Sequence, residues 1–244
     1  MTSAELKQQA KESLKGRWGT AIAMILVYEL IIGGLSLVAK FIPFVGSIAV
    51  LIIAIPISFG FAGQMLKFSR GEEVGICDYF KIGFDNFEKS WSIFGYTLLK
   101  LLLPVITYVL SLVFVVVMST VVATNSSEEI IPIALGIGAL LVIFSVIFLM
   151  VKSYLYVLTD YVGNDFAELD GKGSVQKSED LMKGHRLEFF YLQLSFIGWS
   201  ILAVLTFGIG FIFLEPYIEV TNAKFYDNLA KNSVNNNQEI ITNN

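Results

Sequence analysis

The 244-residue sequence is poor in the residues that most soluble enzymes depend on. It has one cysteine, Cys77, and one histidine, His185, so neither an internal disulfide nor a histidine-rich metal site can form. Charged residues make up 16% of the chain, against about 25% in ordinary soluble domains. No basic patch of the kind that binds nucleic acid is visible. These shortages argue against redox, zinc and nucleic-acid functions.

Apolar residues, by contrast, are abundant. Hydrophobic residues account for 55% of the chain, and the mean hydropathy is +0.68. The net charge of −4 says little about partners, because in membrane proteins the placement of Lys and Arg matters more than their sum. The composition predicts an all-α, polytopic transmembrane helical bundle. We expect one membrane domain over residues 1–231 and a disordered polar tail over residues 232–244.

Apolar runs of about 20 residues mark the expected membrane spans. Four are clear, but residues 187–220 are too long for one straight span and too short for two full ones. Gly208 and Gly210 favour a turn within this region, which gives about six spans, whereas a region without the turn gives five. The expected spans lie near residues 20–39, 44–66, 98–122, 132–158, 187–205 and 210–223.

Positive charges lie in alternate loops. They are frequent in the N-terminal segment, after the second span and after the fourth, whereas the opposite loops have only Lys40 and a stretch, residues 124–131, with two glutamates. By the positive-inside rule the N-terminus is cytoplasmic. Lys224 and Lys231 place the C-terminus in the cytoplasm as well if six spans are correct.

The sequence before the first span predicts an amphipathic helix in the membrane interface. Leu6, Ala10 and Leu14 fall on one helical face with lysines beside them, an arrangement that lets the lysines reach anionic headgroups. Thr2 and Glu5 have the spacing of an N-terminal capping box. We expect this helix to lie on the cytoplasmic surface.

Similar polar segments come before other spans. Leu-Lys-Gly at residues 14–16 matches Met-Lys-Gly at residues 182–184, and residues 87–91 are a looser match. Each unit would consist of a polar helix, a span, a turn and a returning span. Three short matches also arise by chance, because Lys-Gly is common at membrane boundaries, and the chance interpretation is favoured over a true repeat.

Glu29 lies near the middle of the first expected span, where a charged side chain costs about 2.5–3.5 kcal/mol. One interpretation is a proton or cation site. The other, which we favour, is a carboxyl hydrogen-bonded to a tyrosine or to a neighbouring helix. Lys100, near the cytoplasmic end of the third span, is expected to extend toward the interface, with pairing to a membrane carboxylate as the alternative.

Two further glutamates lie in the last expected span. Glu215 and Glu219 are four residues apart, so they share a helical face, and Pro216 stands between them. If the helix begins at the outer turn, both carboxyls lie inside the membrane and need partners. The candidate intramembrane polar site therefore consists of Glu29, Glu215 and Glu219, and the candidate hinge or turn consists of Gly208, Gly210 and Pro216.

The C-terminal part carries a series of motifs that recur together. They are Leu-Met-Lys-Gly at 181–184, Ser-Phe-Ile-Gly-Trp at 195–199, Gly-Ile-Gly at 208–210, Pro-Tyr at 216–217 and Phe-Tyr at 225–226. With the N-terminal LKGRWGTA and the loop FSRGEEVGICDYF, they make the chain similar to the bacterial integral membrane family called domain of unknown function 975. The resemblance covers nearly the whole chain and implies a membrane protein of a bacterial cell. It assigns no catalytic residue, because the family has no assigned chemistry.

No pairing of a nucleophile with a base and no metal-ligand cluster can be assembled from the sequence, so we expect no enzyme activity and no cofactor. One hypothesis is a non-enzymatic envelope component that binds membrane lipids, another membrane protein or a second copy of itself; the basic amphipathic segments indicate it. The other is a small transporter or permease-like protein that uses the buried carboxylates. The sequence favours the first.

Overall fold

The computed structural model describes residues 2–41, 45–125 and 130–242, and all regular structure in them is helical. The elements in chain order are α1 (Ser3–Leu14), α2 (Trp18–Phe41), α3 (Val45–Ser69), α4 (Asp78–Asp85), α5 (Phe87–Asn125), α6 (Ile130–Ser153), the 3-10 helix η1 (Tyr154–Tyr156), α7 (Thr159–Asp165), α8 (Gly171–Met182), α9 (Arg186–Leu194), α10 (Ile197–Leu205) and α11 (Phe211–Thr242). Five segments are long and apolar enough to cross a membrane: Trp18–Phe41, Val45–Ser69, Phe87–Val121, Ile133–Asp165 and Arg186–Leu205. The expected all-helical architecture is confirmed.

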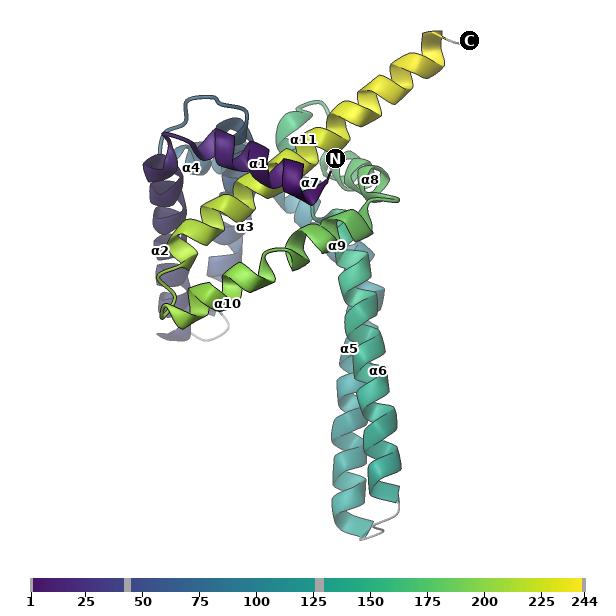
Figure 1. Ribbon diagram of the computed structural model, residues 1–244. Coiled ribbons are helices and arrows are strands. Elements are labelled where there is room, and N and C mark those ends of the chain that lie inside the picture. The colour runs from purple at the N-terminus through teal and green to yellow at the C-terminus, as the bar shows by residue number, and fades with distance from the viewer. Residues whose placement is uncertain (1, 42–44, 126–129, 243–244) are drawn as a thin grey trace.

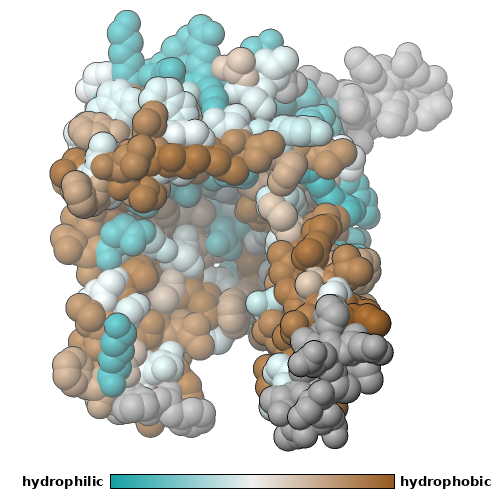
Figure 2. Space-filling view, turned by 60° about the horizontal axis from the view of Figure 1, so that its bottom comes forward, coloured by the Kyte–Doolittle hydropathy of each residue, from teal (hydrophilic) through white to brown (hydrophobic). Residues whose placement is uncertain are grey.

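Two long hairpins, α2–α3 and α5–α6, extend from one end of the molecule, where α1, α4 and α8 gather (Figure 1). Figure 2 shows hydrophobic side chains over the hairpins and hydrophilic side chains at the opposite end. This separation is what a protein with its hairpins in lipid and its short helices in the interface requires. We call α1, α4 and α8 the polar helices.

α1 has the cap and the buried face that its sequence predicts. The Thr2 hydroxyl accepts a hydrogen bond from the Glu5 backbone N–H at 3.3 Å, and the Glu5 carboxylate accepts one from the Thr2 N–H at 2.9 Å. Leu6, Ala10 and Leu14 are all buried. α1 packs against α11, which joins the two ends of the chain.

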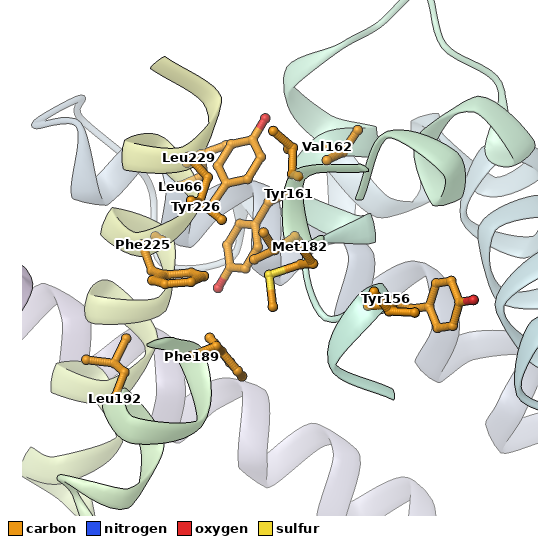
Figure 3. Packing of buried hydrophobic residues seen from close by; sticks show 14 of the residues in the cluster. Leu66, Tyr156, Tyr161, Val162, Met182, Phe189, Leu192, Phe225, Tyr226 and Leu229 are labelled. Atoms are coloured by element: carbon orange, nitrogen blue, oxygen red, sulfur yellow. The ribbon is translucent and has the colours of Figure 1, made fainter. Parts of the chain in front are cut away.

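The main core lies where α7, α8, α9 and α11 meet (Figure 3). The rings of Tyr161 and Tyr226 stack with centroids 5.6 Å apart, and Phe189 lies 5.3 Å from Phe225. Met182 at the end of α8 is fully buried in the same cluster. α11 is therefore a central element of the fold and not a peripheral helix.

α4 lies so close to α3 that the two helices touch through their backbones. A Cβ atom at Gly60 would stand 1.9 Å from the Tyr79 carbonyl oxygen, and one at Gly83 would stand 2.0 Å from the Pro56 carbonyl oxygen. Only glycine fits at both positions. This contact fixes the polar helix α4 on the second hairpin helix, α3.

The polar helices α1 and α8 are built alike. Both have 12 residues, and the side chains of Thr2 and Asp170 cap their N-termini. Both end in Lys-Gly, with the glycine in the left-handed region, at φ +77° in Gly16 and +87° in Gly184. α4 packs on α3 and α1 on α11, whereas α8 packs on both α5 and α7. The likeness of α1 and α8 is local, and an internal repeat stays an untested alternative to chance.

The last expected span, residues 210–223, lies in α11, which begins at Phe211 after the turn and runs 32 residues to Thr242. α11 is not among the helices long and apolar enough to count as a span. The structure accordingly has five candidate spans, and it places residues 232–242 in a helix where the sequence predicts a disordered tail. Glu128 and Glu129, on which part of the expected orientation rests, lie outside the described residues.

Candidate functional site

A cavity of about 480 Å³ lies between α2, α3, α7, α9 and α11. Most of its wall is apolar, but four carboxylates line it: Glu29, Asp160, Glu215 and Glu219. We call it the acidic cavity. The three glutamates predicted from the sequence thus line a single cavity, and Asp160 of α7 joins them.

Helical spacing explains how the side chains reach the cavity. On α2, Ile25, Tyr28 and Glu29 lie three and four residues apart and line the cavity together. On α11, Glu215 and Glu219 are four residues apart and line it from the other side. Neighbouring turns of two helices therefore present their carboxylates to one space.

Among the described residues the four carboxylates have no positive partner, since no lysine or arginine there forms an ion pair with any of them. The one hydrogen bond that the described side chains give these carboxylates is long, 3.5 Å from the Tyr161 hydroxyl to Glu219. Glu29 is exposed and has no hydrogen bond within the described residues, so the favoured expectation of a bonded carboxyl is wrong. Several carboxylates that share one cavity without a cation repel one another, and a cationic ligand would relieve that repulsion.

Lys100 does not supply the missing charge. Its ammonium lies 3.2 Å from the Glu179 carboxylate of α8, which does not line the acidic cavity. The alternative that Lys100 pairs with a membrane carboxylate is therefore wrong.

The carboxylates are spread around the cavity and do not converge on a point. Among the described residues, no three His, Cys, Asp or Glu side chains lie close enough together to hold a metal ion. The arrangement suits a ligand large enough to meet carboxylates on several walls, or protons held at separate sites.

The expected turn before α11 is present, but its first residue in the left-handed region is Phe207 and not one of the two predicted glycines. Phe207 has φ +55° and Gly208 has φ +88°. The Phe207 N–H donates to the Val204 carbonyl at 3.0 Å, and the Gly208 N–H donates to the Ala203 carbonyl at 3.1 Å, the two bonds of a Schellman ending. α10 thus closes with a phenylalanine where glycine is usual.

Gly210 and Pro216 affect how α11 begins and how closely the chain passes α10. A Cβ at Gly210 would lie 2.7 Å from Ala203 Cα, so glycine lets α11 pass close to α10. Pro216 stands inside α11 between the two cavity glutamates and removes the N–H that would bond the Ile212 carbonyl. All three residues predicted as hinge or turn lie at or near the helical hairpin that carries Glu215 and Glu219.

A second polar cluster holds the cavity helices together. The Arg70 guanidinium donates to both Asp165 oxygens, at 2.6 and 3.0 Å, and to one Asp227 oxygen, at 2.7 and 3.0 Å. The Tyr226 hydroxyl donates to Asp165 at 2.8 Å. Burial and then this hydrogen bond raise the pKa of Tyr226, so it stays a donor at neutral pH. We call these four residues the charge clamp; it joins α3, α7 and α11.

Asp160 and the charge clamp escape prediction from the sequence. The fourth apolar run ends at residue 158, so Asp160 is expected outside the membrane, two residues beyond a span. Arg70 and Asp227 are 157 positions apart, and nothing in the sequence pairs them. An acidic residue that directly follows an apolar run is the one signal that could have identified Asp160.

The chain belongs to the family described as protein of unknown function (DUF975), whose model matches residues 1–233. A search of the curated proteins found no match, and a search of the solved structures found none either.

Proposed function

We propose that the protein is a non-enzymatic, multi-pass protein of the bacterial cell membrane whose acidic cavity binds a hydrophobic cation, as a small transporter or permease would. One observation carries this proposal: Glu29, Asp160, Glu215 and Glu219 line a single cavity and have no positive partner in the described part of the chain. Glu29 and Asp160 belong to candidate membrane spans, where ionisable groups are costly to maintain without a function.

The wall of the cavity defines the ligand further. Its volume, about 480 Å³, is that of a site for a small organic molecule. Phe61, Phe189 and Ile218 offer apolar contacts, and the rings of Tyr28 and Tyr161 offer faces that attract a cation. A compound with an apolar body and a delocalised positive charge meets both requirements, because it is cheaper to remove from water than a small metal ion.

Our proposal for the orientation rests on the two ends of the chain. α1 packs on α11, and Figure 1 shows the N-terminus beside α11, at the end where the polar helices gather. The basic segments that precede α2 and α9 lie in or next to these polar helices. We therefore place both termini in the cytoplasm, with the α2–α3 and α5–α6 hairpins in the bilayer.

Binding of ethidium, a planar aromatic cation, tests the proposal. The full chain purified in detergent should bind ethidium, and Glu219→Gln and Asp160→Asn should each weaken binding about ten-fold, since each removes one charge from a site of low dielectric constant. An anionic dye of similar size should not bind. Fluorescence anisotropy gives the affinities, and uptake into proteoliposomes distinguishes transport from binding alone.

A matched control uses Glu168, which is exposed, follows α7 and does not line the cavity. Glu168→Gln makes the same change of charge and should leave ethidium binding unchanged. If the parent protein fails to bind ethidium, or if Glu168→Gln weakens binding as much as Glu219→Gln does, the acidic cavity is not a cation site.

A further inference from the structure

A second hollow, of about 360 Å³, lies between α1, the start of α2 and the α10–α11 hairpin, away from the acidic cavity. We call it the apolar groove. α1 lines this groove but does not line the acidic cavity. The residues that define the groove are Lys11, Trp18, Trp199, Leu202, Phe213 and Tyr217.

The wall of the apolar groove is open to its surroundings. Trp199 is 58% exposed, Phe213 57% and Leu202 53%. At the adjoining tip of the hairpin, Phe207 is fully exposed. A contiguous apolar surface of this kind is unfavourable in water. In a chain with five apolar candidate spans, membrane lipid is the natural molecule to cover it.

One end of the groove is positive. Lys11 is the one charged side chain among the described residues that line it, and it has no ion pair in the described part of the chain. Its ammonium lies 5.5 Å from the centre of the Tyr217 ring. One turn earlier, Lys7 donates to the Ser195 carbonyl at 2.9 Å and covers the Phe196 ring at 4.0 Å. Lys7 thus joins α1 to the segment that leads into α10, and Lys11 lies against α11.

We infer that the apolar groove binds an anionic phospholipid, with an acyl chain between Trp18, Trp199 and Phe213 and the phosphate at Lys11. The apolar wall of the groove matches the acyl chain of the lipid, and its positive end matches the phosphate. The groove has apolar walls, as an acyl chain requires, and its charged end carries a cation with no competing carboxylate among its described residues. A zwitterionic lipid would fill the same walls but would gain less from the free ammonium.

Brominated lipids test the inference, because bromine quenches tryptophan on contact. The chain has three tryptophans, and Trp91→Phe leaves the two that line the groove. This parent variant is placed in nanodiscs of phosphatidylcholine that contain a fixed fraction of brominated phosphatidylglycerol or of brominated phosphatidylcholine. We expect the brominated phosphatidylglycerol to be preferred about five-fold, the effect of one lysine at an anionic headgroup.

Three variants identify the contact. Lys11→Gln should abolish the preference, and Lys11→Arg should retain it. Lys172→Gln, an equal change of charge on the exposed surface of α8 and outside the groove, should also retain it. Equal quenching by the two brominated lipids in the parent would show ordinary boundary lipid and overturn the inference. Loss of the preference in Lys172→Gln, or its survival in Lys11→Gln, would place the anionic lipid elsewhere. If Lys11→Gln does not fold, the parent and Lys11→Arg still decide whether an anionic lipid is preferred.

Discussion

The α2–α3 and α5–α6 hairpins are both built from long apolar helices, but they have different neighbours. α3 packs against α2, α4, α7 and α11, and a third of its most apolar window, 33%, is buried. α6 packs mainly on α5, which also contacts α8, α3 and α7, and only 11% of the most apolar window of residues 87–121 is buried. α3 is therefore part of a packed protein interior, whereas most of the α5–α6 hairpin extends away from the other helices (Figure 1).

The difference shows where the chain can hold a ligand. A pair of helices that extends into lipid away from the rest of the chain would gain no hydrophobic driving force from mutual contact. The α2–α3 hairpin meets α7, α9 and α11 around the acidic cavity, and it carries Glu29 into that cavity. We therefore expect the same kind of substitution to destabilise the protein strongly in the α2–α3 hairpin and weakly in the α5–α6 hairpin.

The largest contrast is expected between two glycines. Gly60→Ala places a Cβ 1.9 Å from the Tyr79 carbonyl oxygen, so α4 must move off α3, and we expect a loss of more than about 3 kcal/mol of stability. Gly136→Ala on α6 meets nothing within 4 Å and should be neutral or raise stability by up to about 1 kcal/mol. Thermal unfolding of the purified protein should show a drop of about 6 °C or more for Gly60→Ala alone. Similar melting of both variants would mean that the close contact between α3 and α4 is absent in the protein.

A smaller effect is expected where the charge clamp is broken. Arg70→Gln leaves Asp227, whose side chain is 9% exposed, without its cation. Because Arg70 is itself 33% exposed, we expect a loss of about 2–3 kcal/mol, less than for a fully buried pair. Lys183→Gln removes a pair with Asp180 in which both side chains are 57% exposed, and it should leave stability nearly unchanged because solvent screens an exposed pair.

Chemical unfolding of Arg70→Gln and Lys183→Gln measures the difference in their loss of stability. Loosening of α3 from α7 and α11 should also weaken ethidium binding in Arg70→Gln, since the clamp joins three helices that wall the acidic cavity. Equal losses of stability in the two variants would show that the charge clamp acts as an ordinary surface ion pair.

Most of the helical architecture follows from local patterns in the sequence. The capping box of Thr2 and Glu5, the buried face of α1 and the turn at Gly208 depend on residues within a few positions of each other. Composition predicts the apolar spans for the same reason. The continuation of α11 through residue 242 was not expected, because a polar sequence without glycine or proline is compatible with both a helix and a disordered tail.

The candidate site was predicted in part, and the missing part is non-local. Depth in the membrane singles out Glu29, and helical spacing pairs Glu215 with Glu219. Their meeting in one cavity, and the addition of Asp160, depend on how α2, α7 and α11 cross, which no local pattern encodes. The predicted hydrogen bond from Glu29 to a tyrosine or a neighbouring helix is wrong for the same reason. In the structure the Glu29 carboxyl lines an open cavity.

The smallest effect is expected inside the α5–α6 hairpin, at its one buried polar contact in the described residues. The hydroxyls of Ser111 and Ser145 lie 3.0 Å apart, and each can donate its single proton to a carbonyl of its own helix instead of to the other serine. Because each serine keeps that local bond, a double-mutant cycle with Ser111→Ala and Ser145→Ala should give a coupling energy of only about 0.6 kcal/mol. Ser119→Ala serves as the control, because the Ser119 hydroxyl donates to the Val116 carbonyl of its own helix and shares no partner with Ser145. A coupling above about 2 kcal/mol would show that a specific hydrogen bond holds α5 to α6. A small coupling would leave close packing, such as that of Gly138 on Val115, as the main attraction within a hairpin that lipid otherwise surrounds.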